Sequence, residues 1–127
     1  MTRETRSWAS KAESDLRVDR NEAAFPQPER DAVCFHCQQS AEKYLKAALC
    51  KLGLPIPPTR DLQRLLLDLL PHESSLKPFR RLLVSLSRFA VDYRYPGFSA
   101  STRDMHAALR HAERIRLKVR MILGLPP

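Results

Sequence analysis

Glycine, cysteine and long apolar runs are scarce in this sequence of 127 residues. Its three glycines form no glycine-rich loop of the kind that wraps a nucleotide phosphate in backbone amides. The apolar runs are only a few residues long, which excludes a membrane-spanning helix, and the stretch MTRETRSW lacks the apolar core of a secretory signal. Three cysteines, an odd number, argue against a disulfide framework. We therefore expect a cytoplasmic protein with reduced cysteines.

Two-residue alternation of apolar and polar side chains is also missing, so no β-sheet is expected. Ten prolines instead divide the chain into stretches whose apolar residues recur at three- and four-residue steps, as on one face of a helix. Helices are predicted over residues 8–24, 30–52, 60–70, 78–95 and about 101–123. Short connections predict one all-α domain over residues 1–127, an antiparallel up-and-down bundle of four to five helices.

The helix starts are marked by residues that commonly open or cap a helix. Ser7 and Thr59 can cap the first and third helices, and Pro78 can occupy the first position of the fourth. Either Ser99 or Ser101 can cap the fifth. Glycines follow the second and fifth helices, where a left-handed residue commonly ends a helix.

The segment CFHCQQSAEKYLKAAL places Cys34, His36 and Cys37 within four positions, so it must be read either as a metal site or as part of a helix. A structural zinc site needs four ligands, and Cys50 lies about 20 Å further along the same helix, too far to close the site. On a helical wheel Cys34 and Cys37 fall in the apolar arc. We therefore predict no metal and two small buried cysteines.

A second arc of the same helix, nearly opposite the apolar one, is polar. It contains His36, Gln39, Lys43, Lys46 and Cys50. A histidine, an amide and two lysines on one face could hold a phosphate, or they could form an ordinary solvated surface. Spacing alone leaves both interpretations open.

The formal net charge of +8 indicates an anionic partner such as nucleic acid, a nucleotide or an acidic protein. A basic cluster in the last helix could follow a nucleic-acid backbone, but Glu113 interrupts it and its members spread around more than one face. A solvated helix is the favoured interpretation of that cluster. Its members are Arg110, Arg114, Arg116, Lys118 and Arg120.

Four segments, WASKAESDL, CFHCQQSAEKYLKAAL, TRDL and YRYPG, resemble the HEPN domain family in this order over about ninety residues. The resemblance implies an antiparallel bundle of four or five helices, homodimerisation and a role in nucleotide or RNA handling. It also implies a possible partner, because many small prokaryotic members work beside a minimal nucleotidyltransferase as a toxin–antitoxin pair. In TRDL this chain has Arg60 where relatives usually have histidine.

In terms of this resemblance, Arg94 in YRYPG occupies the region of the functional arginine. Catalytic relatives carry a histidine four to six residues after it, where this chain has Ser99, Ala100 and Ser101. No catalytic residue is therefore predicted, and whether the protein is an enzyme stays open, with the balance against catalysis. Arg94 either faces a ligand cleft or forms a surface salt bridge.

Asp15 and Asp19 fall on or beside the apolar stripe of the first helix, where an unpaired carboxylate would be unfavourable. Either that edge is solvated or the carboxylates pair with Arg94 or Lys46 across the bundle.

We predict a HEPN-like binding and assembly module without a cofactor, working as a homodimer with a nucleotidyltransferase partner and with nucleotide or RNA as ligand. A phosphate-binding cleft is expected from Arg94, His36, Gln39, Lys43 and Lys46, with Asp15 as a supporting carboxylate. The alternatives are a metal-independent RNase toxin that uses an unconventional histidine such as His36, and a purely structural dimeric subunit.

Overall fold

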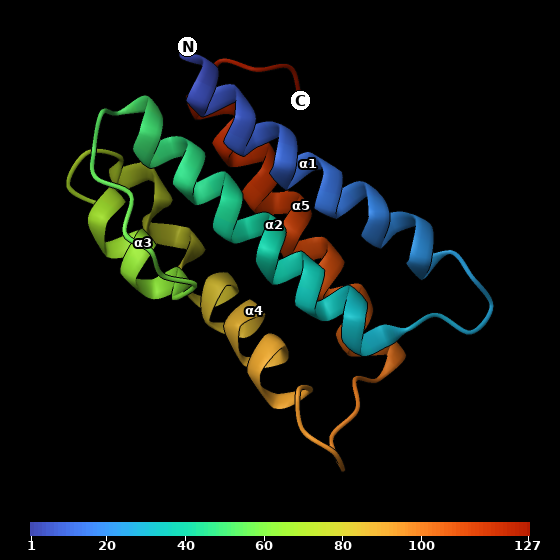
Figure 1. The fold of residues 1–127 in the computed structure, drawn as a ribbon. Coiled ribbons are helices and arrows are strands. Elements are labelled where there is room, and N and C mark those ends of the chain that lie inside the picture. Colours follow the sequence, from blue (N-terminus) through green and yellow to red (C-terminus); the bar gives the residue numbers. More distant parts are fainter.

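The computed structural model describes residues 1–127 as five α-helices and one short 3-10 helix, without strands. In Figure 1, α1 and α2 run antiparallel side by side, α5 lies behind them, and α4 and the short α3 cover the other flank of α2. The predicted all-α class and the number of helices are confirmed. The bounds are α1 Arg3–Ala23, α2 Arg30–Lys51, α3 Leu62–Leu69, η1 Ser74–Phe79, α4 Arg80–Asp92 and α5 Thr102–Leu123.

The second helix, α2, is the centre of the bundle, because α1, α3, α4 and α5 all pack on it. Both Cys34 and Cys37 are fully buried, as predicted from the wheel. Burial goes beyond the predicted apolar arc, however, and Lys46 is only 7% exposed. A helix covered on several sides needs no single apolar face, so periodicity alone understates its burial.

The first helix begins earlier than predicted. Thr2 caps α1, with its side-chain oxygen accepting from the backbone N–H of Thr5, whereas Ser7 lies inside the helix. Thr5 is fully buried and donates to Cys50 Sγ on α2 at 3.2 Å. This contact holds the first turn against the bundle, so the helix extends to the upstream cap.

The third and fourth helices also begin differently from the prediction. Asp61, not Thr59, caps α3 by accepting from Gln63 N, while the Thr59 hydroxyl accepts from Asp61 N in the preceding turn. Pro78 lies within η1, and α4 begins two residues later at Arg80. At α3 two neighbouring residues can cap, and the turn selects Asp61; at α4 the chain first forms a 3-10 turn that contains Pro78, so the α-helix starts after it.

The glycines after α2 and α5, Gly53 and Gly124, adopt φ values of 70° and 73°. These left-handed conformations confirm the predicted helix ends. At the start of α5 the structure selects Ser101 over Ser99. Its hydroxyl accepts from Asp104 N while the Asp104 carboxylate accepts from Ser101 N, which completes a capping box.

Replacing the capping serine, Ser101→Ala, should lower the free energy of unfolding by about 1 kcal/mol, because the first turn of α5 loses a hydrogen-bond acceptor. For a domain of this size that corresponds to a melting temperature lower by roughly 4 °C. Thermal unfolding followed by circular dichroism measures it. Ser99→Ala is the matched control, since Ser99 is exposed and caps nothing, and equal losses in the two variants would contradict the assignment.

A single cluster of 27 buried residues, drawn from all five helices and η1, forms the core. Trp8, Phe79, Phe89 and Tyr93 pack against it from the rim. None of the helices combines the length and hydropathy needed to cross a membrane.

Candidate functional site

The side chain of Arg94 stands at a hollow of about 300 Å³ built by three separate parts of the chain. They are the first half of α2, the turn before α3, and the end of α4. The hollow is lined by Phe35, Gln38, Arg60, Asp61, Ser87, Ala90, Val91 and Arg94. Only the folded bundle brings TRDL and YRYPG to the same place.

Gln38 holds the turn before α3 in position. Only 5% of its surface is exposed, and its Nε2 donates to the backbone oxygen of Arg60 at 2.9 Å. Ser87 of α4 also lines the hollow, but its hydroxyl oxygen is buried and has no hydrogen-bond partner within the chain.

The hollow carries more positive than negative charge. Arg60 and Arg94 are exposed and form no ion pair, so a surface salt bridge does not account for Arg94. The single carboxylate, Asp61, accepts from the N–H of Gln63 as the cap of α3. Two guanidinium groups without an ion-pair partner suit a phosphate or another small anion.

The two lysines expected in the cleft lie elsewhere. Lys43 Nζ pairs with Asp15 Oδ2 at 2.5 Å, and Lys46 Nζ pairs with Glu42 Oε2 at 3.2 Å while lying 5.5 Å from the centre of the Trp8 ring. Both ammonium groups are therefore neutralised by carboxylates, and neither lines the hollow at Arg94. The sequence predicted that Asp15 either is solvated or pairs with a base across the bundle. It does pair with a base, but that base is Lys43 rather than Arg94 or Lys46.

The two remaining cleft residues, His36 and Gln39, adjoin the hollow without lining it. Gln39 Nε2 donates to Gln38 Oε1 at 3.3 Å, and the His36 ring meets the edge of the Phe35 ring at 5.5 Å between centroids. No histidine is among the lining residues.

Asp19 fits neither of the two predicted alternatives. It pairs with no basic side chain, and it is not exposed to solvent. The residue is 1% exposed and receives a hydrogen bond from the Cys37 thiol, while its Oδ2 has no partner. Burial raises the pKa of Asp19 from the ordinary 3.8 to about 8, against the opposing effect of the Cys37 hydrogen bond, and the nearby Asp15 charge adds to the increase. Burial likewise raises the pKa of Cys34 to about 12, so neither that thiol nor Cys37 is a reactive nucleophile.

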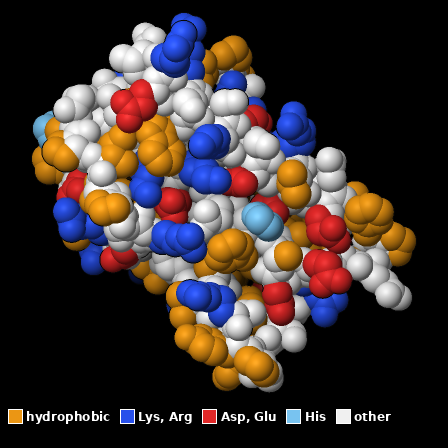
Figure 2. Space-filling model, in the orientation of Figure 1, with side chains coloured by type: hydrophobic (Ala, Val, Ile, Leu, Met, Phe, Trp, Pro, Cys, Tyr) orange, Lys and Arg blue, Asp and Glu red, His pale blue; other side chains and the backbone are white.

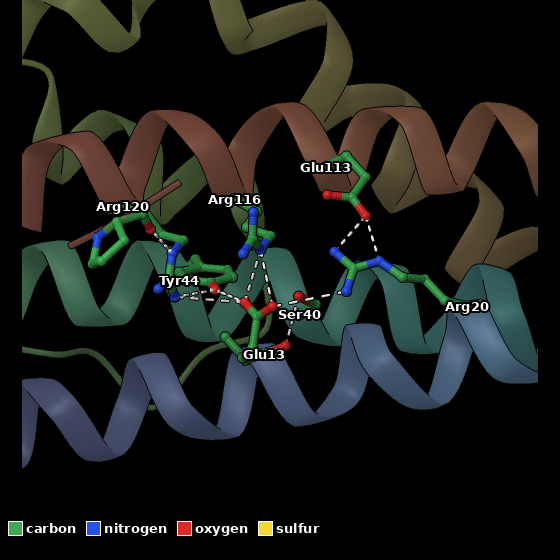
Figure 3. Close-up of polar contacts among 9 residues, drawn as sticks. Glu13, Arg20, Ser40, Tyr44, Glu113, Arg116 and Arg120 are labelled. Atoms are coloured by element: carbon green, nitrogen blue, oxygen red, sulfur yellow. Dashed lines mark hydrogen bonds and ion pairs between the residues drawn. The ribbon is translucent and has the colours of Figure 1, made fainter.

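A second polar cluster, centred on Glu13 between α1, α2 and α5, was missed by the sequence analysis (Figure 3). Arg116 Nε donates to the Glu13 carboxylate at 2.8 Å, and Arg120 and the hydroxyl of the fully buried Tyr44 approach the same group. Burial alone would raise the pKa of Glu13, but the bonds from Arg116 and Tyr44 hold it below its usual range. The three-residue and four-residue steps of Glu113, Arg116 and Arg120 were the available signal, but they could not identify Glu13 as the partner.

The basic cluster predicted in the last helix is thereby divided. Arg116 and Arg120 bind Glu13 inside this network, whereas Arg110, Arg114 and Lys118 form no ion pair. Arg114 lies 5.7 Å from the ring centre of Phe79.

The geometry defines an antiparallel bundle of five helices with an arginine-lined hollow beside its central helix. The chain belongs to the HEPN domain family, whose model matches residues 5–122. Two solved structures share the fold. TT1696 from Thermus thermophilus is 22% identical with a TM-score of 0.83, covering 95% of this chain and 99% of its own. ST0689, an archaeal HEPN homologue, is 23% identical with a TM-score of 0.71, covering 95% of this chain and 98% of its own. Comparison with curated proteins gives no significant match.

Proposed function

We propose that this HEPN domain is a non-catalytic binding module that holds a phosphate-bearing ligand, such as a nucleotide, in the hollow at Arg94. The observation that carries the proposal is the pair of exposed guanidinium groups, Arg60 and Arg94, that share this hollow without an ion-pair partner. Arginine forks match phosphate oxygens in pairs.

The other residues considered for the cleft differ in whether they line the hollow, adjoin it or lie away from it. Phe35 offers an aromatic wall, and Gln39 together with His36 would meet a ligand that extends beyond the hollow along α2. Lys43 and Lys46 have no place in this site because Asp15 and Glu42 hold them. The proposed site therefore keeps Arg94 from the sequence-based cleft and adds Arg60.

The test is a calorimetric titration of the purified protein with pyrophosphate and with AMP. Arg94→Ala should weaken pyrophosphate binding by roughly 10- to 100-fold, because a hydrogen bond to a charged group contributes about 1.5–3 kcal/mol. Arg17→Ala is the matched control: Arg17 is an exposed arginine of α1 without an ion pair, and its loss should leave binding within about twofold. Saturable binding that survives Arg94→Ala unchanged, or no saturable binding in the parent protein, would refute the site.

Family membership also supports the larger assembly that we propose: a homodimer acting with a minimal nucleotidyltransferase in a toxin–antitoxin-type pair. Native mass spectrometry of protein purified gently from its own cells tests this, because it reports the number of copies, any second chain and any retained nucleotide. We expect a dimer with a second chain or a nucleotide-sized mass. A bare dimer or a bare monomer, with no second chain and no nucleotide, would contradict the proposal.

A further inference from the structure

The net positive charge of the protein comes from one part of the chain, residues 76–127. Residues 1–75 contain eleven Lys and Arg and eleven Asp and Glu, so their formal charge is zero. Residues 76–127, which form α4, α5 and the adjoining segments, contain eleven Lys and Arg and only three Asp and Glu, and so carry the whole +8. Asp104, one of the three acids, is already engaged by Tyr93 and Ser101. The excess of basic residues therefore lies in α4, α5 and their adjoining segments, where Arg116 and Arg120 are paired with Glu13 of α1.

Along α4, one exposed row of side chains alternates between charge and apolar surface. Arg81, Val84, Arg88 and Val91 follow each other at three- and four-residue steps, which places them on one face of the helix. The valines are 40% and 54% exposed, and neither arginine forms an ion pair. We call this row the α4 ridge.

The ridge separates two hollows. On one side lies the hollow of about 300 Å³ at Arg94, to which Val91 contributes. On the other side Arg81, Val84 and Arg88 contribute to a hollow of about 360 Å³ that continues to Tyr93 and Asp104. Beyond the end of α4, Tyr95 and Phe98 are 61% and 59% exposed, and apolar side chains are visible at this lower end of the molecule in Figure 2.

We propose that the α4 ridge docks a partner protein, and that this partner binds through an acidic face with an apolar centre. Protein interfaces combine an apolar core with a polar rim and are enriched in Arg, Tyr and Phe, which is the composition of this surface. The excess charge would also accelerate association with an acidic surface. This inference rests on the proposed function in one respect, because it takes up the partner protein proposed above. It names the surface of this chain that the partner would bind and the negative charge that the partner would carry.

Two other occupants fit the ridge less well. A second copy joined through this same face would bring each ridge against its own cationic equivalent, since a twofold interface is self-complementary, and like charges would repel. Nucleic acid would satisfy the arginines and could stack on Tyr95 and Phe98, but Val84 and Val91, which lie between the arginines, offer it neither charge nor an aromatic face. Burial of both valines requires an apolar counterpart, which a protein provides.

Site-specific photo-crosslinking in the native host tests the ridge directly. The photoreactive residue p-benzoylphenylalanine replaces Val91 on the ridge or, as the control, Val18, which is 52% exposed on α1. The adduct is identified by mass spectrometry, and the protein so identified is purified and titrated against the full chain. We expect Val91 to crosslink to a protein of net negative charge, and Val18 not to do so.

Charge reversal completes the test. R81E/R88E should weaken binding of the purified partner at least tenfold, and the loss should shrink at high salt. The control is R3E/R17E, which changes the net charge by the same amount. Arg3 and Arg17 are exposed arginines of α1 that form no ion pair, so this variant should leave binding within about twofold. Thermal unfolding of both double variants checks that the fold is intact.

Several outcomes would overturn the inference: a crosslink to a second copy, a crosslink to nucleic acid, no crosslink at Val91, or equal weakening by the two double variants. Pyrophosphate titration of the parent protein separates this inference from the proposed ligand site. If the parent protein binds pyrophosphate but Val91 gives no crosslink to an acidic protein, only the docking surface is wrong. If Val91 gives that crosslink but the parent protein does not bind pyrophosphate, the docking surface stands without the phosphate site.

Discussion

Asp19→Asn should stabilise the protein, and the gain should grow as the pH rises from about 4 to about 8. The side chain is 1% exposed, and its Oδ2 accepts no hydrogen bond. Burial holds the pKa near 8 in the folded chain, compared with 3.8 for an ordinary aspartate. Between these values the folded protein retains a proton that the unfolded chain has released, so the parent protein loses stability as the pH increases.

The size of the effect follows from this difference in pKa. About four pH units correspond to an upper limit of roughly 5–6 kcal/mol, and local relaxation or water entry reduces what is realised. We expect a gain on the order of 3 kcal/mol at pH 8 and little gain at pH 4. Asparagine is neutral at every pH and retains an oxygen that can accept from the Cys37 thiol.

Urea unfolding at four pH values between 4 and 8, followed by circular dichroism, measures the gain. Asp15→Asn is the matched control on the same helix, because it removes a carboxylate that is paired with Lys43. That variant should show no gain at pH 8. If Asp19→Asn lowers stability at pH 8, or if the two variants have parallel pH profiles, the buried acid is not the cause.

Lys46→Met should destabilise the protein by about 3 kcal/mol, because it leaves the carboxylate of Glu42 buried without its counterion. The side chains of this pair are only 9% and 8% exposed, and Glu42 Oε1 already lacks a partner. A buried pair adds little net stability, but a single buried charge is costly. The double variant Glu42→Gln/Lys46→Met should therefore recover most of the loss.

The neighbouring lysine provides the control for this prediction. Lys43 also pairs with a carboxylate, but its side chain and that of Asp15 are 22% and 21% exposed, so water can solvate the carboxylate that remains. Lys43→Met should cost about 1 kcal/mol or less. Urea unfolding of the four proteins gives the comparison. Equal losses for Lys43→Met and Lys46→Met, or no recovery in the double variant, would show that burial does not govern these pairs.

Arg94 shows how far the candidate site could be predicted. The resemblance carried by YRYPG directed attention to it, and the structure places it at a hollow. Its neighbours there, Arg60 and Ser87, come from parts of the chain whose spacing gives no sign of proximity. Conversely, His36, Gln39, Lys43 and Lys46 share one arc of α2, but that arc meets different neighbours along its length, so they do not form one site.

By itself the sequence determined the local structure: helices without strands, left-handed glycines that end two of them, and cysteines on the buried side of α2. These features depend on steric rules and periodicity within a few residues, which any stretch of chain obeys. Only the tertiary structure decided which of two similar lysines is buried, that Asp19 has no basic partner, and that Arg60 and Arg94 share a hollow. Periodicity identifies the face of a helix, but burial, charge pairing and cavities depend on the neighbour that covers that face.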